Sequence, residues 1–495
     1  MRAGMTKAAL AAFFISTGSF ALDREAVEKL ASDDNDEKIA AIAALVAEGD
    51  PEAAGLLQQA AEGEIEIDGK KVEITVNNRV RGRIAEALSA LQLLSTQRSE
   101  RFVAATALAG GADPSLLPLI KKSMEKESDA DIRALLELTA AGMQLKGDDK
   151  ETRIAAIRVL GSSNNKALLL EAAADPDEDI RYEAQKSLRA VEGRLVWGEW
   201  LGLAFAGASL GSILLLAALG LAITYGLMGV INMAHGELIM IGAYTTYVVQ
   251  GFFRGSSFFD WYLLAAVPTS FITAAVVGMA LERAVIRWLY GRPLETLLAT
   301  WGISLVLIQA VRTLFGAQNV QVENPAFMSG GIQILSNVVL PWNRVFIIVF
   351  AVLVLVGMWA LLSKTRLGLY IRGVTQNRPM AACVGVPTAR VDTWAFGLGS
   401  GIAGLAGCAL SQVGNVGPDL GQGYIVDSFL VVVFGGVGQL AGTVYAALVL
   451  GFTNKLLESW SGAVLAKIAV LVFIIFFIQR RPQGLFALKG RAVEA

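Results

Sequence analysis

The sequence predicts an all-α chain with two unlike parts: a domain of repeated helices, followed by a polytopic α-helical membrane domain. Two observations carry this prediction. The 495 residues have a formal net charge of −2, but residues 22–193 hold 22 Lys and Arg against 33 Asp and Glu, whereas residues 194–495 hold 18 against 11. The second part also contains repeated apolar runs of membrane-spanning length. We therefore expect a water-exposed acidic domain at 22–193 and a membrane domain at 194–495.

Residues 1–21 have the three-part pattern of a secretory signal peptide. Arg2 and Lys7 precede an apolar run over 8–15, and Ser19 and Ala21 occupy the −3 and −1 positions of a cut after residue 21. The run is short for a membrane helix, which favours cleavage over an uncleaved anchor. The acidic domain is then expected in the bacterial periplasm.

Within the acidic domain, one segment is repeated. The sequence KIAAIAAL at 38–45 recurs as RIAAIRVL at 153–160, with a looser copy at 101–108. Each copy is followed by a turn and a second apolar stretch, and alanine at helical spacing lets paired helices approach closely. This pattern resembles an α-solenoid of HEAT-like helix pairs. The stretch EIEIDGKKVEITV at 64–76 departs from it, because its alternation around Asp68-Gly69 indicates a β-hairpin.

The repeated helical surface favours a protein partner, since solenoids offer extended surfaces for binding. A spacer without a partner is the alternative. The acidic charge of this domain excludes a nucleic-acid role.

The membrane domain is expected to cross the bilayer many times, because a helix needs ~20 apolar residues to span it. The expected spans are 205–228, 238–252, 262–284, 296–315, 344–363, 391–412 and 463–479, with a glycine-broken region at 424–455. The span 238–252 is short and extends, in this interpretation, into its polar flank.

The positive-inside rule sets the orientation. Lys and Arg gather around 283–292, 364–390 and 480–491, whereas the connections 316–342 and 411–424 contain neither. Placing the basic connections in the cytoplasm puts the N-terminal domain outside and the C-terminus inside. The signal peptide requires the same side for the N-terminal domain.

The glycine-broken region contains Gly435, Gly436 and Gly438. Two interpretations are open: a tight cytoplasmic turn between two crossings, or a re-entrant break at membrane depth. Non-helical backbone at that depth lines a wet cavity or is buried by protein, and glycine also allows close helix packing. We slightly favour lining of a pathway.

The stretch YGLMGVINMAHGELIMIGAY at 225–244 places Asn232, His235, Gly236 and Glu237 between two apolar runs. Polar and ionisable groups at this depth mark a pathway or a partner. In a structural interpretation, which we favour, Asn232 and Glu237 fix helix ends and Gly236 lets two helices close. In a functional one, these side chains offer hydrogen bonds to a small polar solute.

The connection at 363–392 contains a short predicted helix. Its features are Asn377, Arg378 and Pro379 at the start, Ala382 within it, and Gly385 at its end. A short cytoplasmic helix between membrane helices is suited to docking into a soluble partner. The alternative is a helix that lies on anionic lipid, which the basic residues also support.

Enzymatic chemistry is not expected. The chain has one histidine and two cysteines, Cys383 and Cys408, both in the membrane domain, so neither a metal cluster nor a disulfide framework in the acidic domain is predicted. The sequence GMWALLSKT at 357–365 lacks the second glycine of a phosphate loop. We expect no bound cofactor, and any use of ATP must occur in another subunit.

Three motifs resemble the permeases of branched-chain amino acid ABC transporters. They are the stretch at 225–237, the arginine-flanked loop ending AACVGV at 381–386, and FGGVG at 434–438 followed by Gly442. The resemblance covers about residues 205–485. It implies a second related permease, two cytoplasmic ATPases that dock at 377–386, a periplasmic solute-binding protein and a small polar solute. It places Asn232, His235 and Glu237 beside the translocation path or among residues that brace its helices.

The helical extension ahead of the membrane domain resembles the urea-transporting members of this family. We therefore expect a urea importer, with a branched-chain amino acid or a short amide as the alternative solute. A passive urea channel is a second alternative, but it would need no docking loop. A sensor would need a cytoplasmic output domain, for which the short tail after residue 479 leaves no room.

Overall fold

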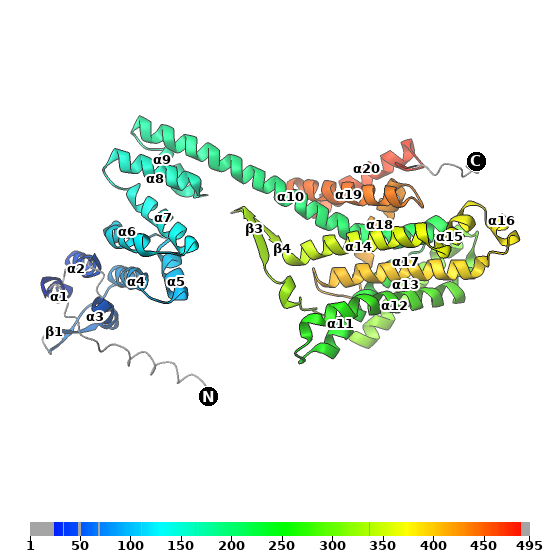
Figure 1. Cartoon of the computed structure of the whole chain (residues 1–495), viewed down its shortest axis with the longest axis horizontal. Helices are drawn as coiled ribbons and strands as arrows, with labels where there is room; N and C mark the ends of the chain where they lie inside the picture. The colour runs from blue at the N-terminus through cyan, green and yellow to red at the C-terminus, as the bar shows by residue number, and fades with distance from the viewer. Residues whose placement is uncertain are drawn as a thin grey trace. The chain divides into compact units, whose positions relative to one another are not determined.

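The computed structural model describes residues 24–486, except 33, 48–50, 68–69, 110, 164 and 336. The expected signal peptide at 1–21 lies outside these residues. The chain forms two compact units, Met1–Val196 and Trp197–Ala495, and each is described by itself. Most described residues are helical, and strands are few (Figure 1).

The first unit is built from short helices joined by turns. Its elements are α1 (Arg24–Leu30), α2 (Asn35–Ala47), α3 (Pro51–Glu62), β1 (Glu64–Ile67), β2 (Lys70–Glu73), α4 (Asn78–Gln92), α5 (Arg98–Ala109), a 3₁₀ turn (Pro114–Leu116), α6 (Leu117–Lys126), α7 (Ala130–Gln144), α8 (Lys150–Ser162), α9 (Lys166–Ala173) and the start of α10 (Glu178–Met228).

The three sequence repeats occupy equivalent places in α2, α5 and α8. In each copy the fourth, fifth and eighth residues are buried, which is the spacing of one helix face. These residues are Ala41, Ile42 and Leu45, then Ala104, Ala105 and Leu108, then Ala156, Ile157 and Leu160. The repeat in the sequence is therefore a repeat in packing.

The basic residue that opens each copy binds backbone carbonyls. Lys38 Nζ donates to Thr75 O at 2.8 Å, Arg101 Nη1 donates to Ser95 O at 3.2 Å, and Arg153 Nε donates to Leu145 O at 3.0 Å. Each side chain therefore links its helix to a neighbouring segment.

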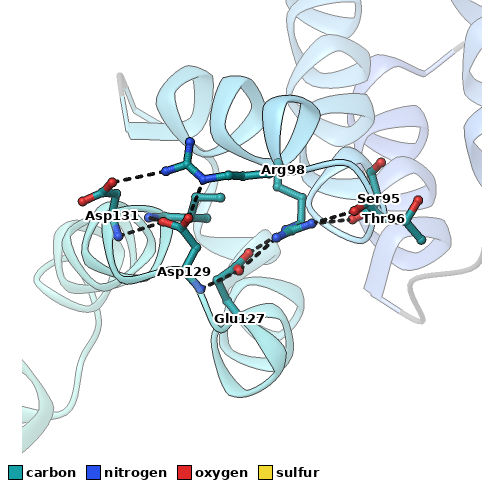
Figure 2. A network of polar contacts seen from close by, with 8 residues as sticks. Ser95, Thr96, Arg98, Glu127, Asp129 and Asp131 are labelled. Atoms are coloured by element: carbon teal, nitrogen blue, oxygen red, sulfur yellow. Dashed lines mark hydrogen bonds and ion pairs between the residues drawn. The ribbon is translucent and has the colours of Figure 1, made fainter.

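Two of these residues also hold a carboxylate from a later turn. Arg101 Nε lies 2.8 Å from Glu127 Oε2. Figure 2 shows Glu127 near a second arginine, Arg98, which contacts Asp129 and Asp131. One repeat later, Arg153 pairs with Asp175. The polar network is thus repeated together with the helices.

The β-hairpin predicted at 64–76 is confirmed. Strands β1 and β2 are antiparallel, and Ile65 lies opposite Val72. The predicted turn residues Asp68 and Gly69 lie outside the described residues.

The second unit continues with the rest of α10 and ten further α-helices. These are α11 (His235–Phe253), α12 (Tyr262–Ala284), α13 (Pro293–Phe315), α14 (Trp342–Lys364), α15 (Arg366–Gln376), α16 (Arg378–Cys383), α17 (Thr388–Ser411), α18 (Gln422–Gly435), α19 (Leu440–Ser461) and α20 (Ala463–Arg480). Three 3₁₀ turns also occur, at Phe259–Trp261, Ile286–Leu289 and Ala326–Met328.

Seven of the described helices are long and apolar enough to cross a membrane: α10, α12, α13, α14, α17, α19 and α20. Each predicted span falls on a helix with similar bounds except 205–228, which is only the C-terminal part of the much longer α10 (Glu178–Met228). Helix α11 extends into its polar flank as predicted. The region 424–455 divides into α18 and α19, with a break at 436–439. Two elements were not predicted: helix α15, and a second hairpin of β3 (Gly331–Leu335) and β4 (Val338–Pro341).

Helix α17 is the centre of the second unit. It packs against α11 and α12 (Figure 1), and most of its residues are buried. Small residues make this possible, because they let helix backbones approach closely in a membrane. A Cβ added at Gly407 would lie 1.9 Å from Ile239 O, so no larger side chain fits there. Cys408, the next residue, is buried, whereas Cys383 in α16 is exposed.

The connections meet in two groups that match the charge pattern. The two connections without Lys or Arg touch through a β-bridge between Val320 and Val416. At the opposite ends of these helices, Arg378 from one basic connection lies over the ring of Tyr290 from another. The grouping inferred from charge therefore agrees with the contacts.

Candidate functional site

The segment 229–234 is non-helical backbone that runs into the membrane domain. Its start follows Met228, the last residue of α10, and it ends where α11 begins at His235. There, His235 Nε2 lies 2.9 Å from Ala217 O, a residue 11 positions before the end of α10. At 1.5 Å per residue, α11 begins about 16 Å from the end of α10, close to the middle of a ~30 Å hydrocarbon core.

Contacts with helix α13 independently place the start of α11 at the same depth. Ser304 Oγ donates to Glu237 Oε1 at 2.8 Å, and Ser304 is 11 residues from the start of α13. The Met233 N–H donates to Thr300 Oγ1 at 3.1 Å one turn earlier. The segment is therefore held along α13 as it rises, and α11 starts part-way through the membrane.

The predicted polar residues are gathered at this junction and are almost fully buried. Asn232, His235 and Glu237 are at most 1% exposed. Asn232 Oδ1 accepts the Ala234 N–H at 3.1 Å and so caps the turn into α11. Asn232 Nδ2, His235 Nδ1 and Glu237 Oε2 have no hydrogen-bond partner within the described chain. Buried polar atoms are normally satisfied, so three neighbouring exceptions require an explanation.

Gly236 lies against the start of a second short helix. A Cβ on Gly236 would lie 2.7 Å from Gly421 O, and a Cβ on Gly421 would lie 1.9 Å from Gly236 O. Gly421 is the N-cap of α18, which has 14 residues and is too short to span the bilayer alone. The N-termini of two discontinuous helices thus meet next to Asn232, His235 and Glu237.

The glycines of the broken region make close backbone contacts. Gly435 faces the backbone of Gly442, and Gly438 faces Gly226 near the end of α10. Gly436 has a φ of +103° and Gly438 of +79°, which L side chains rarely adopt, so both are required by the turn at 436–439. These contacts are those of close helix packing.

The predicted short helix in the connection 363–392 is confirmed as α16. Asn377 is its N-cap and accepts the Met380 N–H at 2.9 Å, Pro379 is in its first turn, and Gly385 follows its end with a φ of +86°. Asn377, Pro379, Ala382 and Gly385 are exposed. Arg378 differs, since its guanidinium forms an ion pair with the buried Asp392 of α17.

A cavity of about 470 Å³ brings two predicted motifs together. Its lining includes Arg372 and Gln376 of α15, Gly438 and Gln439 of the glycine turn, and Gly226 of α10. Helix α15 was not predicted, so a cavity shared by α15 and the glycine turn was not expected from the sequence.

Several polar residues of the membrane domain were missed. Glu282 and Asp392 are fully buried near the ends of α12 and α17. Lys467 Nζ and Asp427 Oδ2 lie 3.4 Å apart. Glu282 and Asp392 could have been identified in the sequence, because each is an acidic residue close to the basic end of an apolar span.

These features define a polytopic helical membrane protein with discontinuous helices at mid-depth. Among the described residues, no group of three or more His, Cys, Asp or Glu could hold a metal ion. Residues 203–479 match the family "Branched-chain amino acid transport system / permease component", and the chain belongs to this family.

Curated relatives align with the same part of the chain. The chain is 27% identical to the high-affinity branched-chain amino acid transport system permease protein BraD of Pseudomonas aeruginosa over 287 residues, which is 56% of this chain and 93% of BraD. It is 27% identical to LivH of Escherichia coli K12 over 288 residues, 57% of this chain and 93% of LivH. A probable LivH of Methanocaldococcus jannaschii is 23% identical over 294 residues, 55% of this chain and 88% of its own length. No solved structure matches the chain.

Proposed function

We propose that this chain is the permease subunit of an ATP-driven ABC importer and forms half of its translocation path with a related permease. The observation that carries the proposal is the junction at mid-depth. Non-helical backbone, two helix N-termini and three buried unpartnered polar atoms meet there. Irregular backbone at this depth lies where protein buries it or where it lines a pathway.

The chemistry of the junction suits a small polar solute. Helix N-termini carry partial positive charge and attract an anionic group or a carbonyl oxygen. The free oxygen of Glu237 accepts N–H groups, and the Asn232 amide donates. Discontinuous helices serve the same purpose at mid-membrane sites in other transporters. His235 and Gly236 brace the junction through Ala217 and Gly421.

A branched-chain amino acid is the first solute to test. The names of the relatives support it, and a zwitterion suits a junction that offers both helix N-termini and a carboxyl group. Urea is the second candidate. It is supported by the unit at 22–193, which precedes the matched residues and resembles the extension of urea-transporting members. A short amide has the same hydrogen-bonding groups as urea.

The partners follow from the importer class. Two cytoplasmic ATPases would dock at the exposed face of α16, where Asn377, Pro379, Ala382 and Gly385 lie. A periplasmic solute-binding protein would deliver solute to the opposite side. The unit at 22–193 would be a periplasmic HEAT-like solenoid that contacts this binding protein or the second permease, and the C-terminus would be cytoplasmic. Gly435, Gly436 and Gly438 would brace the helices along the path.

Uptake of labelled leucine and labelled urea by cells with and without the gene tests the proposal. Each uptake is measured with both unlabelled solutes as competitors, with urease inactivated and with cellular ATP depleted in parallel. Gene-dependent leucine uptake that requires ATP supports the first candidate, and gene-dependent urea uptake that requires ATP supports the second. Urea uptake that persists without ATP would indicate a passive channel and contradict the importer.

A further inference from the structure

Arg378 of helix α16 differs from the exposed residues of this helix, because its side chain contacts the membrane helices. Arg378 is 40% exposed, and its guanidinium forms an ion pair with Asp392, whose side chain is 1% exposed. The guanidinium carbon also lies 5.2 Å from the ring centroid of Tyr290. Stacking over an aromatic face and pairing with a carboxylate both suit arginine better than lysine.

Tyr290 connects this arginine to the membrane helices. Its hydroxyl donates to Glu282 Oε1 at 2.9 Å and lies 3.2 Å from the sulfur of Met228. Glu282 is fully buried and also accepts Thr393 Oγ1 at 2.7 Å, so it links α12 to α17. The ion pair and the tyrosine thus tie α16 to three helices of the membrane domain.

The same contacts reach the mid-membrane junction. Met228 is the last residue of α10, directly before the non-helical segment 229–234. Met228 and Tyr290 pack on a small core of Val230, Ile286 and Phe396, and Val230 belongs to that segment. A displacement of Tyr290 is therefore passed to the backbone that leads to Asn232 and Glu237.

The burial of the Asp392 carboxylate at this place is poorly explained by stability alone. Removing a charge from water costs free energy that an ion pair often only offsets, and an apolar pair is commonly as stable. Arg378 also leaves much of its surface in solvent, so it is held by two contacts that a small shift of α16 would break together.

We infer that Arg378 is a positioning residue, which couples α16 to the mid-membrane junction through Asp392 and Tyr290. This rests on the proposed importer function, in which α16 carries the ATPase. It assigns Arg378 to transmission within this chain, whereas the exposed residues of α16 make the docking contact.

The test uses the complete importer, with its second permease, ATPases and binding protein, reconstituted in liposomes. Three quantities are measured: ATPase retained on purification, ATP hydrolysis rate, and solute imported per ATP hydrolysed.

The informative variant is the double variant Arg378→Ala with Asp392→Asn. It removes both charges, so no carboxylate is left buried without a partner. Arg390→Ala is the matched control, because Arg390 is exposed on the same connection and its side chain makes no ion pair among the described residues.

The double variant is expected to retain the ATPase but to import about ten-fold less solute per ATP, within the range by which coupling networks act. Arg378→Lys keeps the charge and loses the stacking, so it should restore import only in part. Tyr290→Phe should lower import per ATP without loss of assembly, and Arg390→Ala should leave it unchanged.

Two results would overturn this inference but leave the proposed function intact. The first is a double variant that imports as much solute per ATP as the wild type. The second is a double variant that loses the ATPase, because Arg378 would then be a docking contact. A wild-type complex that binds no ATPase and imports neither solute would instead overturn the proposed function, and the inference with it.

Discussion

Three basic side chains do the same structural work in the first unit. Lys38, Arg101 and Arg153 open the repeats, and each donates to a carbonyl of a neighbouring segment. Because a loose turn exposes unpaired carbonyls, a long basic side chain is a compact way to satisfy them. The arginines do more, since each also neutralises a half-buried or buried carboxylate.

Replacing Arg101 by alanine should destabilise the first unit by about 2 kcal/mol, because it leaves the buried Glu127 carboxylate without its partner. Hydrogen exchange of peptides from α5 and α7 in the purified full-length chain would measure this as faster exchange. Arg133→Ala is the control, since Arg133 and its partner Glu137 are both about half exposed and such pairs contribute little. Equal effects of the two variants would contradict the assignment.

Acid should weaken the same contacts. The hydrogen bond from Arg101 lowers the pKa of Glu127, and the hydrogen bond from the Asp177 N–H, together with the ion pair to Arg153, lowers the pKa of Asp175. A lowered folded pKa gives stability that is complete above the unfolded values near ~4 and is lost as the pH falls through the folded values. Thermal unfolding of the first unit should therefore begin at lower temperature at pH 3 than at pH 6. The double variant Glu127→Gln with Asp175→Asn should show a smaller difference between these two pH values.

At the scale of elements, the junction of α11 and α18 depends on two glycines. Replacing Gly236 by alanine should cost about 1–3 kcal/mol or block assembly, since its Cβ would meet the backbone of Gly421, which cannot move as a side chain can. Gly251→Ala in the same helix is the control, because nothing lies within 4 Å of its Cβ. Thermal stability in detergent and the yield of assembled complex would distinguish them. A harmless Gly236→Ala would mean that the two helix N-termini are not held this closely.

Much of the element pattern could be predicted from the sequence. The membrane spans, the first hairpin and helix α16 follow from local signals such as apolar runs, turn residues and capping residues, and they lie where those signals place them. Helix α15 was missed because its arginines were interpreted as a basic loop. The second hairpin was missed because strand β3 is largely exposed and strand β4 has no regular alternation of buried and exposed residues.

The site was predictable in composition but not in contacts. Asn232, His235 and Glu237 were found because polar groups are rare in apolar surroundings. The partners of His235 and Glu237, which are Ala217 and Ser304, come from other elements, as does Gly421, which contacts Gly236. No local pattern indicates these contacts. The pairs Arg378–Asp392 and Lys467–Asp427 were also out of reach, because a pairing between helices depends on how the helices pack.

At the scale of the whole molecule, the first unit has no counterpart in the residues that match the family. If it serves as a docking surface outside the membrane, deleting residues 22–193 while keeping 1–21 should leave the membrane domain inserted but reduce uptake at low solute concentration. The same deletion should change uptake little when the solute-binding protein is present at a saturating concentration. Normal uptake and normal assembly of the deletion variant would leave the unit as a spacer.

Cys383 is exposed and Cys408 is buried, so thiol labelling of the native chain can report which side of the membrane Cys383 faces. If α16 lies on the cytoplasmic side and docks the ATPase, as proposed, a membrane-impermeant maleimide should modify Cys383 only from that side, and bound ATPase should shield this thiol. Cys408 should react only after unfolding, because it is fully buried in α17. The proposed orientation and the proposed docking at α16 can thus both be tested in the unmodified sequence, with a single reagent.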